Sequence, residues 1–245
     1  MKIVVIGAGA AGLLAAGKAA ETADEVVIIE KNDIIGKKLL ITGKGRCNIT
    51  NSADIEDMIG QYPRNAKFLY SALYTFTNDD IIRIIEENGV KTKVERGGRV
   101  FPVSDKSQDV VKALKKYALK PNVSLVHDTV KSLIISDGAV KGVKTSKTSI
   151  TADRVIICTG GKSYPRTGST GDGYKFAKQA GHTIIEPKAS LIPVLTEEKF
   201  VKDIMGLSLR NIKITAFNQK NKKVYSDFGE MLFTHFGISG PVVLS

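Results

Sequence analysis

The sequence has little cysteine, no long apolar run and no stretch of low complexity. Its 245 residues include only 2 cysteines, which excludes a disulfide framework, and no pair is spaced like a zinc site. No apolar run reaches the roughly 18 residues that a membrane-spanning helix needs. Pro, Gly and Ser are not concentrated enough for a disordered chain. What remains is a globular protein of α/β type. Two thiols suit a reducing compartment, so we expect it to be cytoplasmic.

The charge is strongly positive and unevenly distributed. The net charge is +11, and residues 91–175 carry 17 basic and 7 acidic side chains, whereas residues 51–90 carry 3 basic and 7 acidic ones. Such asymmetry can mark a nucleic-acid face. The basic residues lack the interleaved aromatic residues of a single-strand binding surface. We therefore favour a solvated lysine-rich surface with some cations near a phosphate-bearing ligand, and nucleic acid is disfavoured as a partner.

The N-terminal part has the pattern of a nucleotide-binding βαβ unit. Residues 2–6 predict a short buried strand, and residues 7–12 follow it with the complete pattern G-x-G-x-x-G. A helix is predicted from about residue 10 to residue 20, and a second strand over 25–29 ends in Glu30. The strand, the helix and the acid at this spacing favour a ligand over a turn that is merely rich in glycine. The motif alone leaves FAD and NAD as alternatives.

Each glycine of this motif has a separate physical task. Gly7 allows the tight turn, Gly9 lets a pyrophosphate approach the backbone, and Gly12 lets the helix pack close to the strand. The helix N-terminus offers free N–H groups and the positive end of its dipole to an anion. Glu30 lies where a carboxylate accepts hydrogen bonds from ribose hydroxyls.

The segment after Glu30 departs from a repeating βαβ dehydrogenase. Between residues 31 and 51, glycines alternate with cations, and the segment also holds an apolar triplet, Leu39 to Ile41. Glycines beside cations suit a packed loop along an extended anionic ligand, which we favour over a solvent loop. The glycines and cations are Gly36, Lys37, Lys38, Gly43, Lys44, Gly45 and Arg46.

Further elements are expected along the rest of the chain. The first are a helical region over 54–88, a Gly-Gly hairpin over 94–101 and a helix over 107–119 capped by Ser107. Strands over 123–127, 129–135 and 139–145 follow, and then a buried strand that ends in Thr159-Gly160-Gly161. The segment Gly168 to Gly173 opens a helix whose N-terminus Asp172 serves, and two more strands are expected near 209–217 and 222–226. A short helix is expected to begin at Gly240.

Several longer strings make the sequence similar to a known family. They are Gly36 to Leu40, Gly43-Lys44-Gly45-Arg46-Cys47-Asn48, Arg96 to Pro102, Thr170 to Gly173, and Gly229 to Pro241 with its Thr-His-Phe-Gly-Ile-Ser-Gly core. Together with the glycine motif they resemble the YhiN-like or BaiN-like flavoproteins, also called the aminoacetone oxidase family of FAD-binding enzymes. The resemblance covers essentially the whole chain.

The resemblance implies a fold, a cofactor and a domain plan. The fold would be a three-layer Rossmann-like FAD-binding domain, with a parallel sheet and a β-meander, over residues 1–192. Residues 193–245 would begin an inserted β-rich domain on the substrate side. Because family members continue past this point and then return to the FAD domain, we expect a truncated chain, in which tight retention of FAD is in question. NAD(P)H is a candidate electron donor.

The resemblance also assigns cofactor contacts. The pyrophosphate would face Gly7, Gly9, Ala10, Ala11 and Gly12; Glu30 would hold the adenosine ribose with Lys31 beside it; Lys38, Gly43, Arg46, Cys47 and Asn48 would run along the flavin; Val130 would contact adenine through its backbone; and Thr159, Gly160 and Gly161 would pass close to the dinucleotide.

The chemistry stays open at the level of sequence, because a flavin would carry it. Cys47, flanked by Arg46, which would lower its pKa, and His235 are weak catalytic candidates; packing is favoured for Cys47 and a structural role for His235. The leading function is an FAD-dependent oxidoreductase of a small organic molecule, either oxidising an amine with oxygen or reducing a conjugated bond or ketone with NAD(P)H. The alternatives are a flavoprotein that acts on RNA and a non-catalytic nucleotide-binding fragment. No metal or membrane partner is expected, and the oligomeric state is left unassigned.

Overall fold

The computed structural model describes residues 1–244 and divides the chain into two compact units, Met1–Ile184 and Ile185–Ser245. The sequence analysis placed the domain boundary after residue 192, whereas the chain divides after Ile184. That the second unit is an inserted substrate-side domain stays a prediction. The two units are described separately below.

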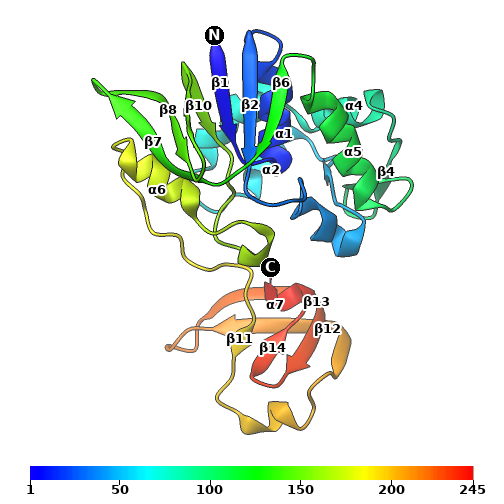
Figure 1. Cartoon of the computed structure of the whole chain (residues 1–245). Helices are drawn as coiled ribbons and strands as arrows, with labels where there is room; N and C mark the ends of the chain where they lie inside the picture. Colours follow the sequence, from blue (N-terminus) through cyan, green and yellow to red (C-terminus); the bar gives the residue numbers. More distant parts are fainter. Residues whose placement is uncertain (245) are drawn as a thin grey trace. The chain divides into compact units, whose positions relative to one another are not determined.

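The first unit is built on a parallel sheet of four strands (Figure 1). Its strands are β1 (Lys2–Ile6), β2 (Glu25–Glu30), β6 (Val123–His127) and β10 (Arg154–Ile157), in the order β10-β1-β2-β6. Helix α1 (Ala10–Ala19) connects β1 to β2. Strands β1 and β2 are runs of Val and Ile that are buried on both faces, as strands of a covered parallel sheet must be.

Two further layers cover this sheet. Ile3 and Val5 of β1 pack in a core cluster with residues of α1 and of α5 (Ser107–Ala118). Val4 and Ile6 point to the other face and pack with residues of β7 (Val130–Ser136), β8 (Ala139–Thr145) and α6 (Asp172–Gln179). Strand β9 (Ser149–Thr151) completes the antiparallel meander β7-β8-β9. The expected three-layer α/β fold with a β-meander is therefore confirmed.

The helical region expected over 54–88 is interrupted, so that prediction was wrong in its continuity. It contains α2 (Ile55–Gly60), η2 (Ala66–Leu69), α3 (Tyr70–Thr75) and α4 (Asn78–Glu87). After α2, Asn65 takes a left-handed conformation with φ 53° at the N-cap of η2, which interrupts the helical backbone. Thr77 and Asp80 form a capping box that starts α4 as a separate helix. The hairpin is confirmed as β4 (Thr92–Glu95) and β5 (Arg99–Pro102), and β5 also pairs with β3 (Thr50–Asn51).

The expected cap of α5 is wrong. Ser107 is the first helical residue, the N-cap position belongs to Lys106, and no side chain caps this end. The Ser107 hydroxyl instead donates a hydrogen bond to the Leu40 carbonyl at 3.1 Å. This bond ties α5 to the 3-10 helix η1 (Leu39–Gly45), so the segment after β2 is packed against the unit.

The second unit is an antiparallel sheet with the strand order β11-β14-β13-β12. Its elements are β11 (Val194–Leu195), η4 (Lys199–Lys202), β12 (Ser208–Phe217), β13 (Lys223–Thr234), β14 (Gly237–Ser239) and α7 (Pro241–Leu244). The two expected strands are present, and the second is longer than expected because it continues to pair with β14 near its end.

Candidate functional site

The register of the parallel sheet brings three loop starts to one edge. Ile6 pairs with both Ile29 and Ile157, so β1, β2 and β10 end side by side. The next residues, Gly7, Glu30 and Cys158, therefore lie together at the carboxyl edge. The chain leaves β1 toward β2 on one side, while β10 returns on the other, which is the switch point where open α/β sheets bind ligands.

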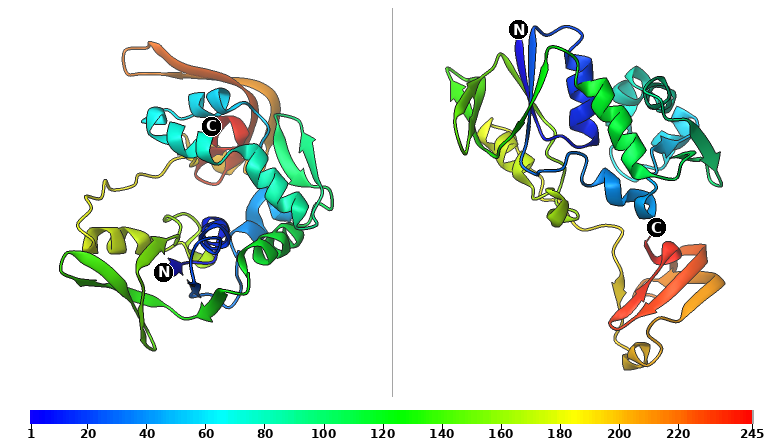
Figure 2. Two further views of the ribbon diagram at one scale, coloured as in Figure 1. Left: turned by 90° about the horizontal axis from the view of Figure 1, so that it is seen from above. Right: turned by 45° about the vertical axis from the view of Figure 1, so that its right-hand side comes forward.

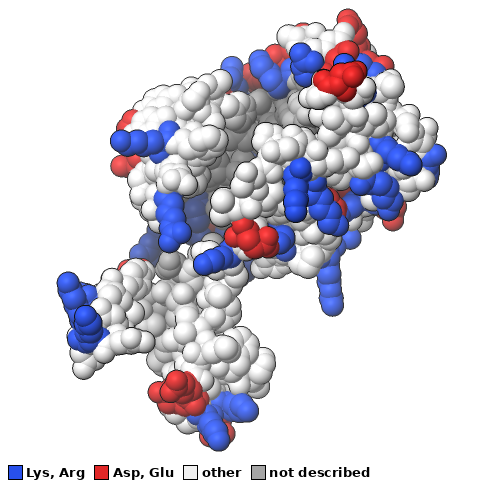
Figure 3. All heavy atoms as spheres, turned by 90° about the vertical axis from the view of Figure 1, so that its left-hand side faces the viewer, with Lys and Arg blue, Asp and Glu red and all other residues white. Residues whose placement is uncertain are grey.

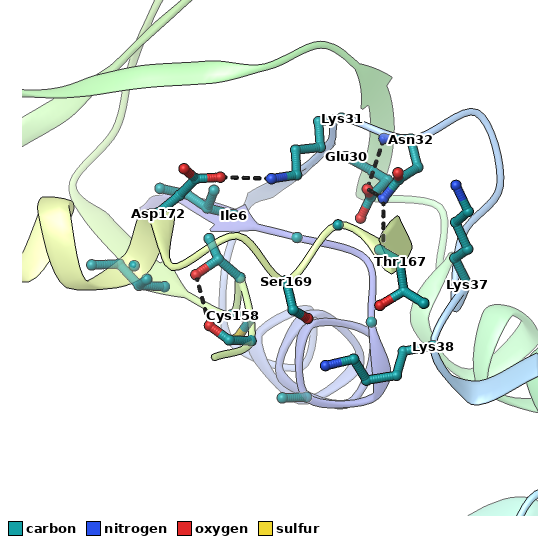
Figure 4. Close-up of a pocket in the computed structure, with 18 of the residues that line it drawn as sticks. Ile6, Glu30, Lys31, Asn32, Lys37, Lys38, Cys158, Thr167, Ser169 and Asp172 are labelled. Carbon is teal, nitrogen blue, oxygen red and sulfur yellow. Dashed lines mark hydrogen bonds and ion pairs between the residues drawn. The ribbon is translucent and has the colours of Figure 1, made fainter. Parts of the chain in front are cut away.

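A pocket of about 700 Å³ opens at this edge within the first unit. It is formed by the glycine motif, the end of β2 and its following loop, the start of β7, the end of β10, and the start of α6 (Figure 4). The cofactor-site residues expected from the sequence that line it are Gly7, Gly9, Ala10, Ala11, Glu30, Lys31, Lys38, Val130, Thr159, Gly160 and Gly161. The fold thus gathers residues from four separate parts of the chain around one cavity.

The three glycines of the motif have different surroundings. Gly7 has φ +103°, and an added Cβ would lie 2.6 Å from the Cys158 carbonyl oxygen. A Cβ on Gly12 would lie 1.8 Å from the Gly7 carbonyl oxygen, so this glycine is needed for helix packing. A Cβ on Gly9 would meet nothing within 4 Å, although Gly9 lines the pocket. The bare backbone of Gly9 therefore borders open space and serves no packing need.

The N-terminus of α1 is free to interact with an anion. Gly9 is its N-cap, no side chain caps it, and its first turn contains no acidic residue. The Leu13 N–H donates to the Gly9 carbonyl at 3.0 Å, whereas the preceding N–H groups of the first turn have no intrahelical acceptor. These N–H groups and the positive end of the helix dipole face the pocket through Ala10 and Ala11.

Glu30 is buried at the pocket edge and is already well hydrogen-bonded. Its carboxylate accepts from the Ala8 N–H at 2.7 Å, from the Asn32 N–H at 2.8 Å and from the Asn32 side-chain amide at 2.7 Å. A carboxylate has about four acceptor positions, so one is left for a ligand hydroxyl. These bonds fix the carboxylate orientation, which a sequence pattern could not reveal.

Two lysines expected at the cofactor are paired with protein groups, and Figure 4 draws the pair of Lys31 with Asp172. The Lys31 ammonium lies 2.6 Å from the Asp172 carboxylate and 2.7 Å from the Thr170 hydroxyl. Partial burial disfavours the charged Asp172 carboxylate, but the Lys31 and Thr170 hydrogen bonds outweigh it and keep its pKa below the ordinary value. The Lys38 ammonium donates to the Ser163 carbonyl at 2.8 Å. Both lysines thus hold the loop before α6 against the loop after β2.

The loop that follows β10 also packs tightly against the start of α6. Gly160 has φ +72°, and a Cβ there would lie 2.7 Å from the Ser169 hydroxyl. A Cβ on Gly173 would lie 2.5 Å from the Thr159 hydroxyl oxygen. These two glycines therefore lie close to protein side chains as well as lining the pocket. Asp172 is the first residue of α6, and Gly171 is its N-cap.

Five expected site residues do not line the pocket: Gly12, Gly43, Arg46, Cys47 and Asn48. Arg46 makes a bidentate ion pair with Glu95, at 2.8 and 3.1 Å, and a further one with Asp105 at 3.2 Å. Its guanidinium also lies 4.0 Å from the centroid of the Phe101 ring. These partners tie η1 to the β4–β5 hairpin.

Cys47 belongs to the core cluster and is 1% exposed. Burial raises the pKa of its thiol, which corrects the expectation that Arg46 would lower it. The packing role favoured for Cys47 therefore fits its surroundings. Gly43 lies against Phe101 and Asn48, and Asn48 itself is exposed.

His235 belongs to the second unit. It lies between β13 and β14, and its ring packs edge-on against Phe236 with 4.7 Å between the centroids. This ring contact is compatible with the structural role that the sequence favoured. Catalytic involvement of His235 or Cys47 stays a prediction.

Several polar residues of the pocket were missed, and Asn32 and Asp128 are two that make defined contacts. Asn32 links Glu30 to the Thr167 carbonyl, which its amide reaches at 3.4 Å. Asp128 is buried, and hydrogen bonds, foremost the one from the Ser146 hydroxyl, hold its pKa well below the usual range. It follows β6 directly, and a polar residue at the carboxyl end of a predicted strand is a signal that could have found it.

Within residues 1–244 no helix is long and apolar enough to cross a membrane. Across the same residues, no group of three or more His, Cys, Asp or Glu side chains is arranged to hold a metal ion.

Comparison with known proteins gives consistent matches. Residues 1–240 match the family described as HI0933-like protein Rossmann domain. The chain is 36% identical to the ribosomal RNA dihydrouridine synthase of Haemophilus influenzae and 33% identical to the 3-dehydro-bile acid delta(4,6)-reductase of Clostridium scindens. Each alignment covers 98% of this chain, and 59% and 58% of those relatives. The chain therefore spans about three fifths of the length of these relatives.

Among solved structures, the apo Sdh1 complex of Mycobacterium smegmatis matches with a TM-score of 0.55 and 22% identity. The match covers 73% of this chain and 38% of that one. At this identity the likeness supports the fold alone.

Proposed function

Because the chain belongs to the HI0933-like Rossmann family, we propose that its first unit binds FAD and that it forms part of an FAD-dependent oxidoreductase. The observation that carries the proposal is the open space beside Gly9 at the uncapped N-terminus of α1. A side chain at Gly9 would meet no protein atom, whereas a dinucleotide pyrophosphate needs this close approach to the backbone. The pocket volume of about 700 Å³ is in the range of cofactor sites.

The lining residues fit the parts of FAD in order. The free N–H groups at Ala10 and Ala11 would bind the pyrophosphate, and the remaining acceptor position of Glu30 would take a ribose hydroxyl. Val130 would border the adenine, and Lys38 would lie on the flavin side. When bound, FAD supplies hydride transfer, for which the protein provides binding, orientation and electrostatics.

The reaction that we favour is reduction of a carbon–carbon double bond conjugated to a carbonyl, with NAD(P)H as electron donor. The activities for which the relatives are named support it, since saturating uridine to dihydrouridine and reducing a delta(4,6) bile-acid derivative are both reductions of this kind. Oxidation of an amine with oxygen has no such support among these relatives. The small-molecule substrate remains a class, a conjugated enone.

RNA is the second candidate substrate, and two observations favour it. Two curated relatives are named ribosomal RNA dihydrouridine synthase, from Haemophilus influenzae and from Escherichia coli. The chain is also strongly basic, with a net charge of +11. On the face drawn in Figure 3, however, lysine and arginine side chains form separate groups with uncharged surface between them. This face therefore offers no continuous positive patch, and binding of RNA would need contacts other than charge.

The test begins with the purified protein loaded with FAD under anaerobic conditions. NADH or NADPH is added and bleaching of the flavin bands is recorded; then a 3-oxo-4,6-diene steroid or uridine-containing RNA is supplied. In a separate arm without NAD(P)H, aminoacetone is added to the oxidised flavin, and oxygen is admitted afterwards. Reoxidation by the diene or the RNA, with the product saturated at one double bond, is the expected result. Flavin reduced by aminoacetone and reoxidised only by oxygen would instead support an amine oxidase.

A further inference from the structure

A small helical region of the first unit carries a concentration of exposed aromatic rings. We call the segment 55–76, which contains α2, η2 and α3, the aromatic lobe; it is drawn in cyan in Figure 2. Five of its rings are substantially exposed: Tyr62 (45%), Phe68 (86%), Tyr70 (38%), Tyr74 (54%) and Phe76 (41%). Grouped exposed apolar side chains mark interaction surfaces, whereas isolated ones do not.

The rings do not serve the core of the unit. Among the helices of the aromatic lobe only Ile59 of α2 is buried, and η2 and α3 bury no residue. Phe68, which is in η2, is the most exposed large apolar side chain in the first unit among the described residues. The ring therefore contributes little to the packing of the unit and is accessible to a ligand.

Part of the surface is held in a fixed geometry. The Tyr70 and Tyr74 rings are stacked with 6.0 Å between their centroids and an interplanar angle of 14°. Both hydroxyls donate to the Glu56 carboxylate, at 3.0 and 2.5 Å. The bonds to Glu56 also raise the pKa of both tyrosines, so the rings stay neutral. A rigid neutral aromatic pair costs little conformational entropy when a flat group binds.

Two exposed cations lie beside the most exposed ring. Arg64 and Lys67 precede Phe68, and neither forms an ion pair among residues 1–244. Exposed aromatic rings next to free cations are the combination that binds single-stranded nucleic acid, by base stacking and phosphate contact. The basic residues of 91–175 lack this combination, whereas the aromatic lobe lies in the acidic stretch 51–90 before them.

We propose that the aromatic lobe binds single-stranded RNA, with bases stacked on Phe68 and the tyrosine pair, and with phosphates at Arg64 and Lys67. The inference rests on the RNA arm of the proposed function. Stacking would supply most of the affinity, because the acidic first turn of α2 reduces the positive charge of the lobe. Salt dependence should therefore be shallow, with only two phosphate contacts from the lobe itself.

The probe is a fluorescein-labelled oligouridylate of 12 nucleotides, and its Kd is measured by fluorescence anisotropy at several salt concentrations. Phe68→Ala should weaken binding about 5- to 150-fold without changing the salt slope, because a lost stacked base is worth about 1–3 kcal/mol. The double variant Arg64→Gln/Lys67→Gln should lower the slope by about 1.4, since each single-strand phosphate contact contributes about 0.7.

Matched controls lie outside the aromatic lobe. Tyr164→Ala removes another ring that is 70% exposed, and Lys141→Gln removes an exposed cation of β8. Neither should change the affinity more than about twofold, a limit of about 0.4 kcal/mol. Because Phe68 is mostly exposed, its removal should leave the urea midpoint unchanged, which checks that the variant is folded.

Equal weakening by Phe68→Ala and Tyr164→Ala, no effect of Phe68→Ala, or no RNA binding by the wild-type protein would each overturn the inference. The first outcome would indicate binding without a defined surface. The second would show that no base stacks on the exposed ring of Phe68. Retention of FAD by the same preparation separates these results from failure of the proposed cofactor site.

Discussion

The glycine motif allows a test that separates ligand binding from folding within six residues. Gly9→Ala adds a methyl group that meets no protein atom within 4 Å, at a φ of −81° that any residue adopts. Gly12→Ala adds one that would lie 1.8 Å from the Gly7 carbonyl oxygen. The first change should impair FAD binding with little effect on folding, and the second should impair folding itself.

The expected magnitudes follow from these surroundings. At an N-cap, alanine costs up to about 1 kcal/mol relative to glycine, while the reduced freedom of the unfolded chain returns roughly 0.4–1 kcal/mol, so Gly9→Ala should change stability little. In Gly9→Ala the added methyl group would keep the pyrophosphate away from the backbone N–H groups. Losing one hydrogen bond to a charged phosphate costs about 1.5–3 kcal/mol, so the Kd for FAD should rise about 10- to 150-fold. Gly12→Ala forces a backbone shift in a packed region, which should cost about 1–3 kcal/mol or more.

The assay combines urea unfolding with titration of FAD followed by flavin fluorescence, on the wild type and on both variants. The reasoning predicts opposite profiles for the two variants. If Gly9→Ala binds FAD as tightly as the wild type, the open space at Gly9 does not receive the pyrophosphate. If Gly12→Ala is as stable as the wild type, the contact with Gly7 is not the constraint that we infer.

Three other predictions concern the residues around the pocket. Arg46→Ala should lower the Tm by several degrees, because Arg46 pairs with two carboxylates and covers Phe101. Arg46→Lys should restore only part of the lost Tm. A Tm of Arg46→Ala equal to that of the wild type would contradict the structural role. A small thiol reagent should modify half-buried Cys158 before buried Cys47, as mass spectrometry of the labelled peptides would reveal. FAD should protect Cys158 from the reagent, because Cys158 lines the pocket. Equal labelling of Cys158 with and without FAD would argue against the site. Because hydrogen bonds depress the pKa of Asp128, its stabilising contribution is complete above the ordinary carboxyl pKa of about 3.9 and declines as the pH falls below it. Urea midpoints between about pH 6 and pH 3 should therefore fall less steeply in Asp128→Asn than in the wild type, and parallel curves would refute this.

Much of the fold could be predicted because its signals are local. The β1–α1–β2 unit follows from two buried apolar runs joined by a glycine motif, and the turn of the β4–β5 hairpin follows from Gly97 and Gly98, which both have positive φ. The prediction of a continuous helix over 54–88 was wrong because the spacing of apolar residues carries no information about the capping box at Thr77. That spacing also continues through the left-handed Asn65 without any change.

The gathering of predicted residues at one pocket could be read from the sequence in outline, but the partners of the charged groups could not, and the cofactor contacts stay a prediction. The sequence placed Lys31 and Lys38 at a cofactor, and both line the pocket, but they also pair with Asp172 and Ser163. Such pairs join positions more than a hundred residues apart, so no spacing rule reveals them. Arg46 is the clearest case, because a cation beside glycines suggests an anionic ligand until Glu95 and Asp105 are seen against it.

The central claim, that the pocket at the carboxyl edge of β1, β2 and β10 holds FAD, is tested most directly by a visible absorption spectrum. The protein is mixed with FAD, separated from free flavin by gel filtration, and measured as it elutes. The account predicts that the two visible flavin bands elute with the wild-type protein and are much weaker with Gly9→Ala at the same protein concentration. A wild-type protein that is folded by circular dichroism, elutes without flavin and leaves the fluorescence of titrated FAD unchanged would contradict it.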